Sequence, residues 1–222
     1  MDAGCSHILL LDQDSALPDG MVKKLLDAEC QLLAAGKKVA AVGPLFVEEK
    51  TGEISRTVRH RWFGIKREVV DRNGAAPVET DYLIASGSLI RASVLREIGG
   101  MMDALFIDWV DIEWGLRARA CGFGSYLVPG ALLRHSVGDL SVKIWGKSLP
   151  FHNDLRNCYI VRNSVYLLRV KTMGWQWRIL TVPRIPHYIY LYFWHSQHRM
   201  KSLRLLMHAF WDGLRGKLGR LS

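Results

Sequence analysis

Two short apolar runs enclose one amphipathic segment near the start of the chain, and this order constrains the fold more than any other feature. The runs are Ile8–Leu11 and Lys38–Val47, and the segment between them, Met21–Gly36, repeats its apolar residues with the period of an α-helix. A strand, a helix and a second strand in this order form a parallel βαβ unit. The pattern therefore predicts an α/β fold with a mostly parallel sheet and covering helices.

The segments that follow continue this alternation. Glu48–Pro77 is polar and rich in turn residues, which predicts an irregular hairpin or loop. Thr80–Gly100 is predicted to form a strand, a small-residue turn and a helix. Asp103–Phe123 predicts a helix with an acidic start, Ser125–Gly138 predicts a strand, and Phe151–Val170 opens a region with helical periodicity.

The positive charge of the chain is concentrated at its end. The 222 residues carry a formal net charge of +9, yet residues 151–222 hold 12 Lys and Arg against 2 Asp and Glu, whereas residues 1–150 hold 18 and 19. Residues 151–222 also contain 12 of the 22 aromatic residues. We therefore place a boundary near residue 150, between an α/β domain, 1–150, and a basic aromatic helical region, 151–222.

A basic, aromatic region suits an anionic surface, either phospholipid headgroups or nucleic acid. No nucleic-acid-binding motif accompanies the charge, so the predicted partner is an anionic membrane surface and not a nucleic acid. From Met200 onwards, apolar residues recur at helical spacing among basic ones, which is typical of an interfacial amphipathic helix; they include Leu203, Leu206, Met207, Phe210, Trp211, Leu214 and Leu218. The alternative is that this stripe packs on the α/β domain or in a homo-oligomer.

The cysteines and the apolar stretches indicate the compartment. The four cysteines, at positions 5, 30, 121 and 158, form neither a CxxC pair nor a zinc-finger spacing, which predicts reduced, buried thiols. No signal peptide is recognisable. The apolar stretch Ile185–Trp194 has ten residues, about half of what a membrane span requires. The sequence thus predicts a cytoplasmic protein, peripheral to the inner face of the cell membrane.

Two carboxylates follow the first apolar run, at Asp12 and Asp14. Ligands of open α/β sheets bind beyond the carboxyl ends of the strands, and side chains at positions i and i+2 of an extended segment point to the same side. The pair is therefore a candidate site for a hard divalent cation that holds a diphosphate. The alternative is that Asp14 or Ser15 caps the next helix and that Asp12 is only solvated.

Three further segments carry candidate site residues. The acids Asp108, Asp111 and Glu113 lie at or just before a predicted helix start, where the helix dipole favours anions; alternatively, they only stabilise the helix, with Arg117 as partner. His135 ends an apolar run, where a structural role is the alternative. Ser86 and Gly87 offer hydroxyl and backbone groups to a sugar pocket, or form only a tight turn.

The order of these segments resembles the GT-A glycosyltransferases of family 2, especially the bacterial rhamnosyltransferases. The resemblance runs from about His7 to Arg169. It is carried by the stretches LLLDQDS, ASGSLIR, FIDWVDIEWGLRARACGF and RHSVGD, and the later HNDLRNCYIVRNSVYLLR is similar to the segment that follows in those enzymes. It implies that residues 1–150 are a Rossmann-like GT-A catalytic core.

The resemblance also implies roles for the candidate residues. Asp12 and Asp14 would contact the metal and the nucleotide diphosphate, and His135 would complete the metal shell, with Mn²⁺ or Mg²⁺ as the cofactor. Asp111 would be the general base and Glu113 its orienting or acceptor-binding neighbour. Asp108 would bind substrate and would be the third choice for the base. The family has Glu-Asp at this point, whereas Val110 precedes Asp111 here.

The implied reaction is inverting sugar transfer. The donor would be a nucleotide sugar, dTDP-L-rhamnose, and the acceptor a lipid-linked saccharide or polysaccharide of the cell surface, such as O antigen. The ILLLD strand begins after only seven residues, so we expect the nucleotide-binding part to be N-terminally incomplete, by roughly 80–100 residues. An inactive truncated fragment and a non-catalytic membrane-surface binding module are the alternatives.

Overall fold

The computed structural model describes residues 4–13, 15–48, 54–61, 64–135, 141–144, 147–150 and 154–221, with the side chains of residues 48, 135 and 141–150 outside this description. The chain divides into two compact units. The first contains Met1–Met101 and Asp111–Ser136, and the second contains Met102–Val110 and Val137–Ser222. The short segment Met102–Val110 therefore belongs with the C-terminal helices.

The first unit is built on a five-stranded sheet. Its strands, in spatial order, are β1 (His7–Leu9), β6 (Leu89–Arg91), β2 (Val39–Glu48), β7 (Gly124–His135) and β5 (Val78–Thr80). Only β2 and β7 pair in parallel, because β6 runs antiparallel to both of its neighbours and β5 antiparallel to β7. The α/β class is confirmed, but the sheet is mixed and not mostly parallel.

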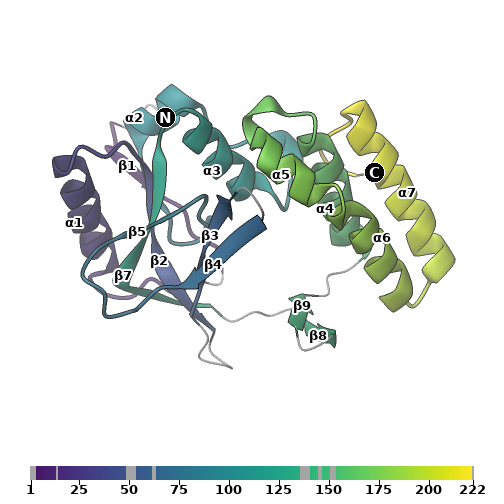
Figure 1. The fold of residues 1–222 in the computed structure, drawn as a ribbon, viewed down its shortest axis with the longest axis horizontal. Helices are drawn as coiled ribbons and strands as arrows, with labels where there is room; N and C mark the ends of the chain where they lie inside the picture. Colours follow the sequence, from purple (N-terminus) through teal and green to yellow (C-terminus); the bar gives the residue numbers. More distant parts are fainter. Residues whose placement is uncertain are drawn as a thin grey trace. The chain divides into compact units, whose positions relative to one another are not determined.

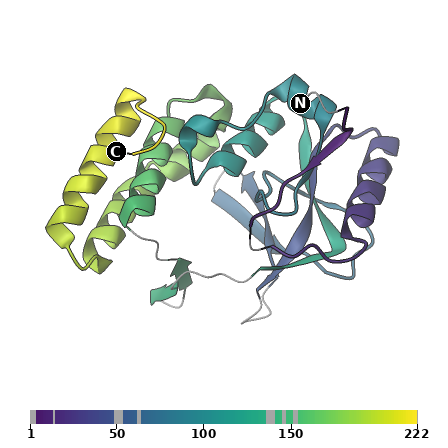
Figure 2. The same cartoon turned by 180° about the vertical axis from the view of Figure 1, so that it is seen from behind.

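The insertion of β6 explains this difference. Because β1 and β2 are both antiparallel to β6, they run in the same direction, as predicted for a strand–helix–strand unit. The helix between them, α1 (Met21–Ala34), also matches the prediction. What the periodicity could not reveal is that a later strand, β6, would pair between them, since this pairing joins segments about eighty residues apart (Figure 2).

Helices cover both faces of the sheet (Figure 1). One face packs on α1, and the other packs on α2 (Ala92–Ile98) and α3 (Val110–Ala120). The α1 side contributes Met21, Leu25, Ala28 and Leu32 to the core, and the opposite side contributes Val94, Leu95, Ile98, Trp114 and Ala118. Two apolar layers thus fix the sheet from both sides.

The polar segment Glu48–Pro77 contains a hairpin, as predicted. Its strands are β3 (Arg56–Arg61) and β4 (Gly64–Val69), paired antiparallel. A buried carboxylate, Asp81, anchors this hairpin: it accepts hydrogen bonds from the backbone N–H of His60 at 2.6 Å and from its Nδ1 at 2.5 Å, and it pairs with Arg119 of α3.

The second unit is mainly helical, as predicted for the C-terminal region. In chain order it contains η1 (Asp103–Leu105), β8 (Ser141–Ile144), β9 (Lys147–Pro150), α4 (Asp154–Leu167), η2 (Lys171–Met173), α5 (Gly174–Thr181), α6 (Arg184–His195) and α7 (Arg199–Arg215). Cys158 and Val161 of α4 form a buried cluster with Leu206 and Ala209 of α7. The helices approach closely at Gly213, where a Cβ atom would lie 2.5 Å from the Arg162 carbonyl oxygen.

The cysteines differ from the prediction. Only Cys158 is buried, and Cys5, Cys30 and Cys121 are exposed. Burial raises the pKa of the Cys158 thiol to about 11. The prediction was wrong because a spacing that excludes metal sites says nothing about which face of an element a thiol occupies. Among the described residues, no helix is both long enough and apolar enough to cross a bilayer.

Candidate active site

The segment after β1 lies against the turn before β6. The N–H of Leu10 donates to Ser88 O at 3.0 Å, and the N–H of Gly87 donates to Leu10 O at 2.7 Å. Ser86, a buried residue, accepts a hydrogen bond from the N–H of Asp12 at 3.3 Å. Its hydroxyl also lies 2.7 Å from that of Ser15. The turn that was predicted from ASGS therefore holds the backbone around Asp12.

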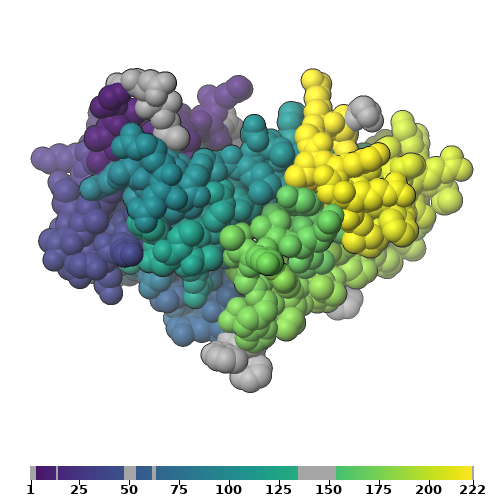
Figure 3. Space-filling view, turned by 90° about the horizontal axis from the view of Figure 1, so that it is seen from above, coloured from purple at the N-terminus to yellow at the C-terminus, as the bar shows by residue number. Residues whose placement is uncertain are grey.

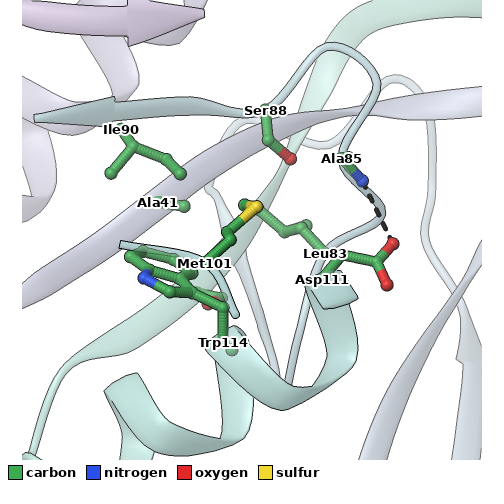
Figure 4. Close-up of a pocket in the computed structure, with 10 residues that line it drawn as sticks. Ala41, Leu83, Ala85, Ser88, Ile90, Met101, Asp111 and Trp114 are labelled. Carbon is green, nitrogen blue, oxygen red and sulfur yellow. Dashed lines mark hydrogen bonds between the residues drawn. The ribbon is translucent and has the colours of Figure 1, made fainter. Parts of the chain in front are cut away.

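Asp111 approaches the same turn from the first turn of α3. Its Oδ2 accepts a hydrogen bond from the N–H of Ala85 at 3.2 Å (Figure 4). Its Oδ1 accepts one from the N–H of Ile112 at 2.8 Å. The N-terminal end of a helix dipole stabilises a carboxylate in this position.

Adjacent residues of one turn thus connect two of the candidate acids. Ala85 binds the side chain of Asp111, and Ser86 binds the backbone of Asp12. These acids are almost a hundred residues apart in the sequence, so their link through one turn is a tertiary feature. The structure therefore brings together Asp12, Ser86, Gly87 and Asp111 within the first unit.

A small cavity lies beside Asp111, but it is not a sugar pocket. Its volume is about 10 Å³, which is close to the space of one water molecule. Most of its lining is apolar and includes Leu83, Ile90, Met101 and Trp114 (Figure 4). It is a gap in the core, and Asp111 lies at its rim.

Glu113 occupies a different environment. It is buried, and its two carboxylate oxygens accept hydrogen bonds from Nε and Nη2 of Arg117 at 2.9 and 3.0 Å. Arg117 also donates to the carbonyls of Ile98 and Gly100. This arrangement is the helix-stabilising alternative weighed from the sequence, and it ties α3 to the end of α2. A catalytic role of Glu113 stays a prediction.

Asp108 belongs to the second unit. The guanidinium of Arg156 on α4 binds its carboxylate, with Nε 3.1 Å from Oδ2 and Nη2 3.1 Å from Oδ1. The Asp108 side chain is mostly buried. Such a forked pair fixes the plane of the carboxylate and leaves oxygen lone pairs for another donor.

The predicted metal ligands are only partly within the described structure. Asp12 is exposed, whereas Asp14 and the side chain of His135 lie outside the described residues. Among the described side chains, no group of three His, Cys, Asp or Glu is arranged to hold a metal ion. The metal assignment therefore depends on the strands that deliver these residues.

The strand directions fit such a site. Strands β1, β2 and β7 run in the same direction, so the ends that lead to Asp12 and His135 lie at one edge of the sheet. Two strands lie between β1 and β7, a separation of roughly 14 Å. Carboxylates with an imidazole suit Mn²⁺ or Mg²⁺, and the segments beyond the strands would have to bridge this separation.

Several contacts of the site could not be read from the sequence. The N–H of Ala85 and the hydroxyl of Ser15 are common groups that no sequence motif marks as functional. Arg156 and Asn163 lie in the segment Phe151–Val170, and the sequence pattern assigns neither of them a role. A signal was present in that segment, since polar residues recur there on a helix that otherwise reads as apolar.

Comparisons with known proteins indicate which enzymes this chain is similar to. No family model matches the chain. The chain is 29% identical over 219 residues to the dTDP-rhamnosyl transferase RfbF of Shigella flexneri, spanning 99% of this chain and 72% of that protein. A crystal structure of GalNAc-T7 with UDP, GalNAc and Mn²⁺ matches at 12% identity and a TM-score of 0.49, and the match spans 96% of this chain but only 40% of that one. The chain is therefore similar along almost its whole length to a dTDP-rhamnosyl transferase.

Proposed function

We propose that this chain transfers rhamnose from dTDP-rhamnose to a saccharide acceptor at the cell membrane. The observation that carries the proposal is the turn at Ala85 and Ser86, which binds both the side chain of Asp111 and the backbone of Asp12. This link occurs in a chain similar to a dTDP-rhamnosyl transferase over 99% of its length. The donor is assigned from that relative, since no described residue identifies a base or a sugar.

Asp111 would act as the general base. A sugar hydroxyl is a poor nucleophile, and removing its proton during attack contributes roughly 10²–10⁴ in rate. The hydrogen bonds from Ala85 and Ile112 fix the orientation of the carboxylate. A single displacement of the nucleoside diphosphate then inverts the anomeric centre, as it does when one carboxylate activates the attacking oxygen in inverting glycosidases.

Asp12, Asp14 and His135 would hold a divalent cation, Mn²⁺ or Mg²⁺. When bound, that cation neutralises charge on the departing diphosphate. The backbone contact between Asp12 and Ser86 would keep the acidic loop at the carboxyl edge of the sheet. Ser86 itself is buried and hydrogen-bonded to Ser15, so it would support this loop.

The test is incorporation of labelled rhamnose. The wild-type chain is incubated with dTDP-[¹⁴C]rhamnose, Mn²⁺ and membranes that contain lipid-linked saccharide, and label in the lipid phase is counted. We expect EDTA to abolish incorporation, and we expect UDP-glucose not to serve as a donor in place of dTDP-rhamnose. If neither dTDP nor labelled lipid is formed, the proposed function is contradicted and a non-catalytic or inactive chain is favoured.

The acceptor side of the proposal rests on the surface of α7. Met200, Met207, Trp211 and Leu214 lie on one face of this helix, and Met200 and Trp211 are 64% and 50% exposed. The opposite face packs against α4 through Leu206 and its buried neighbours. Figure 3 shows the end of α7, in yellow, on the molecular surface. An apolar stripe therefore faces outward, away from the packed face.

Basic and aromatic groups border this stripe. Lys201, Arg204 and Arg215 are exposed on α7, and the Arg215 guanidinium lies 6.0 Å from the ring of Trp211. On α6, Trp194 stacks with exposed Tyr190 and lies under Arg199 at 4.8 Å. Apolar groups flanked by cations are complementary to the headgroup region of an anionic leaflet. We assign this face to the cytoplasmic side of the membrane.

Vesicle binding tests this surface. The wild-type chain should co-sediment with vesicles of phosphatidylcholine and phosphatidylglycerol, and the bound fraction should fall as salt is raised. Trp211→Ala should weaken binding several-fold, whereas Leu205→Ala, on another face of α7, should leave it unchanged. Equal binding to neutral vesicles would contradict the electrostatic part of this assignment. A stable dimer that dissociates in Trp211→Ala would show that a second copy covers the stripe instead.

A further inference from the structure

A strained turn precedes α3. Phe106 has φ 67° and ψ −60°, and the N–H of Ile107 donates to Leu105 O at 2.9 Å. These values describe a γ-turn of the rare, strained kind. Asp108 and Trp109 also have positive φ, of 61° and 67°. Three residues with side chains thus occupy a region that normally favours glycine.

Two adjacent side chains of α4 hold this turn. The Nδ2 of Asn163 donates to the carbonyl oxygens of Leu105, Ile107 and Asp108, at 3.0, 2.9 and 3.2 Å. The Nη2 of Arg162 donates to the same Leu105 oxygen at 3.0 Å. Together with the N–H of Ile107, these two side chains give the Leu105 carbonyl oxygen three hydrogen bonds.

The burial of this pair is unusual for polar groups. Asn163 is 0% and Arg162 1% exposed. The Nε of Arg162 donates to Oδ1 of Asn163 at 3.0 Å, which orients the amide towards the turn. Desolvation lowers the pKa of Arg162 from its ordinary value. A buried cation and a buried amide destabilise the fold unless they are hydrogen-bonded. Here most of their hydrogen bonds go to one turn.

The side chains of the turn explain why glycine does not occupy it. Trp109 is buried against Trp177, with the ring centroids 6.2 Å apart. Phe106 stacks on Tyr159 at 5.1 Å yet keeps 53% of its surface exposed. Asp108 presents its carboxylate in the fork of Arg156. The turn thus presents the ring of Phe106 and the carboxylate of Asp108, next to the guanidinium of Arg156 on α4.

Strained residues that the surroundings over-determine are characteristic of functional sites. A carboxylate and a guanidinium together accept from and donate to sugar hydroxyls, and an exposed ring packs against the apolar face of a sugar. We infer that Asn163 and Arg162 are positioning residues, which hold Asp108 and Phe106 in place to bind the acceptor saccharide. This inference rests on the proposed glycosyl transfer and adds the side of the reaction that receives the sugar.

A set of paired variants isolates the strain. Asn163→Ser keeps one donor and Asn163→Ala removes all of them, so a graded loss is expected if either variant folds. Phe106→Gly removes the ring and relieves the positive φ, whereas Phe106→Ala removes the ring and keeps the strain. The two Phe106 variants therefore differ mainly in the backbone strain that Asn163 must offset.

The kinetic readout separates positioning from a purely structural role. Well below the unfolding temperature, Asn163→Ser should lower transfer to the lipid-linked acceptor about tenfold or more, with the KM for dTDP-rhamnose unchanged. Both Phe106 replacements remove the ring, so neither restores the wild-type rate, but Asn163→Ser with Phe106→Gly should transfer faster than Asn163→Ser with Phe106→Ala. Unchanged transfer per folded molecule in Asn163→Ser, or equal rates for the two double variants, would overturn the inference.

Amide hydrogen exchange gives a readout without turnover. The N–H of Ile107 should be protected in the wild type, exposed in Asn163→Ser and protected again when Phe106→Gly is added. Unchanged protection in Asn163→Ser would show that Asn163 does not hold the turn. A wild-type chain that transfers no sugar would refute the proposed function and the acceptor role together, and the exchange data would then decide the role of Asn163 in the turn separately.

Discussion

Asp111→Asn should lower the rate of rhamnose transfer by about 10²- to 10⁴-fold and leave the fold intact. Asparagine has almost the same shape, and its amide oxygen can still accept the hydrogen bond that Ala85 donates to Asp111. The amide cannot take a proton from the acceptor hydroxyl, so the loss should appear in kcat, with little change in donor KM. Initial rates with labelled dTDP-rhamnose measure the effect.

Glu97→Gln is the matched control for this variant. Glu97 is an exposed acid of α2 in the same unit, and its replacement also removes one negative charge. It should transfer sugar at the wild-type rate. A rate for Asp111→Asn within about threefold of the wild type would remove Asp111 from the role of base, because loss of general-base catalysis is far larger than that.

Gly87→Ala should disrupt both the stability and the activity of the first unit. Gly87 has φ 74°, and an added Cβ would lie 2.6 Å from Cγ and 2.9 Å from Cδ of Pro44. The proline ring is rigid, so the turn itself must move. Overpacking costs about 1–3 kcal/mol and the left-handed backbone about 1–2 kcal/mol more. The displaced turn would then release Asp111 and the loop of Asp12.

Thermal unfolding and transfer rates measure this effect together. For a protein of this size, each kcal/mol corresponds to about 2–4 °C, so we expect the midpoint to fall by about 4 °C or more, with transfer strongly reduced below it. Gly100→Ala is the control, because a Cβ there meets no atom within 4 Å. A Gly87→Ala midpoint within 1 °C of the control would contradict the packing described for the turn.

The fold was predictable where local pattern decides it. The helix α1, the strand β2 and the helical C-terminal region follow from the periodicity of their apolar residues. The direction of the sheet was not predictable in the same way. The strand β6 pairs with β1 through contacts far apart in sequence, and no local pattern specifies which strands become neighbours.

The C-terminal stripe shows a related limit. Leu206 and Trp211 both recur with helical period, yet Leu206 is buried against α4 and Trp211 is exposed. Periodicity groups apolar residues but does not say which of two apolar faces packs inside. One face of α7 therefore packs on α4, and the membrane role of its exposed face stays a prediction.

The acids of the candidate site could be selected from the sequence and their partners could not, and the catalytic roles of these acids stay predictions. Asp12 and Asp111 were identified as carboxylates at element ends, where charge is functional or well solvated. Their connection through Ala85 and Ser86 depends on backbone groups that every residue has. The clamp of Asn163 on the turn before α3 also depends on tertiary contacts, so only its polar residue types on an apolar helix could have signalled it.

A crystal structure of this chain with dTDP and Mn²⁺ would test the central claim most directly. We expect the diphosphate beside the loop of Asp12, over the turn at Ser86, with the Asp111 carboxylate open to an acceptor on the other side of the sugar site. A nucleotide bound on the second unit, or a diphosphate out of reach of Asp12 at saturating dTDP, would contradict the assignment of this turn as the centre of a glycosyltransferase site.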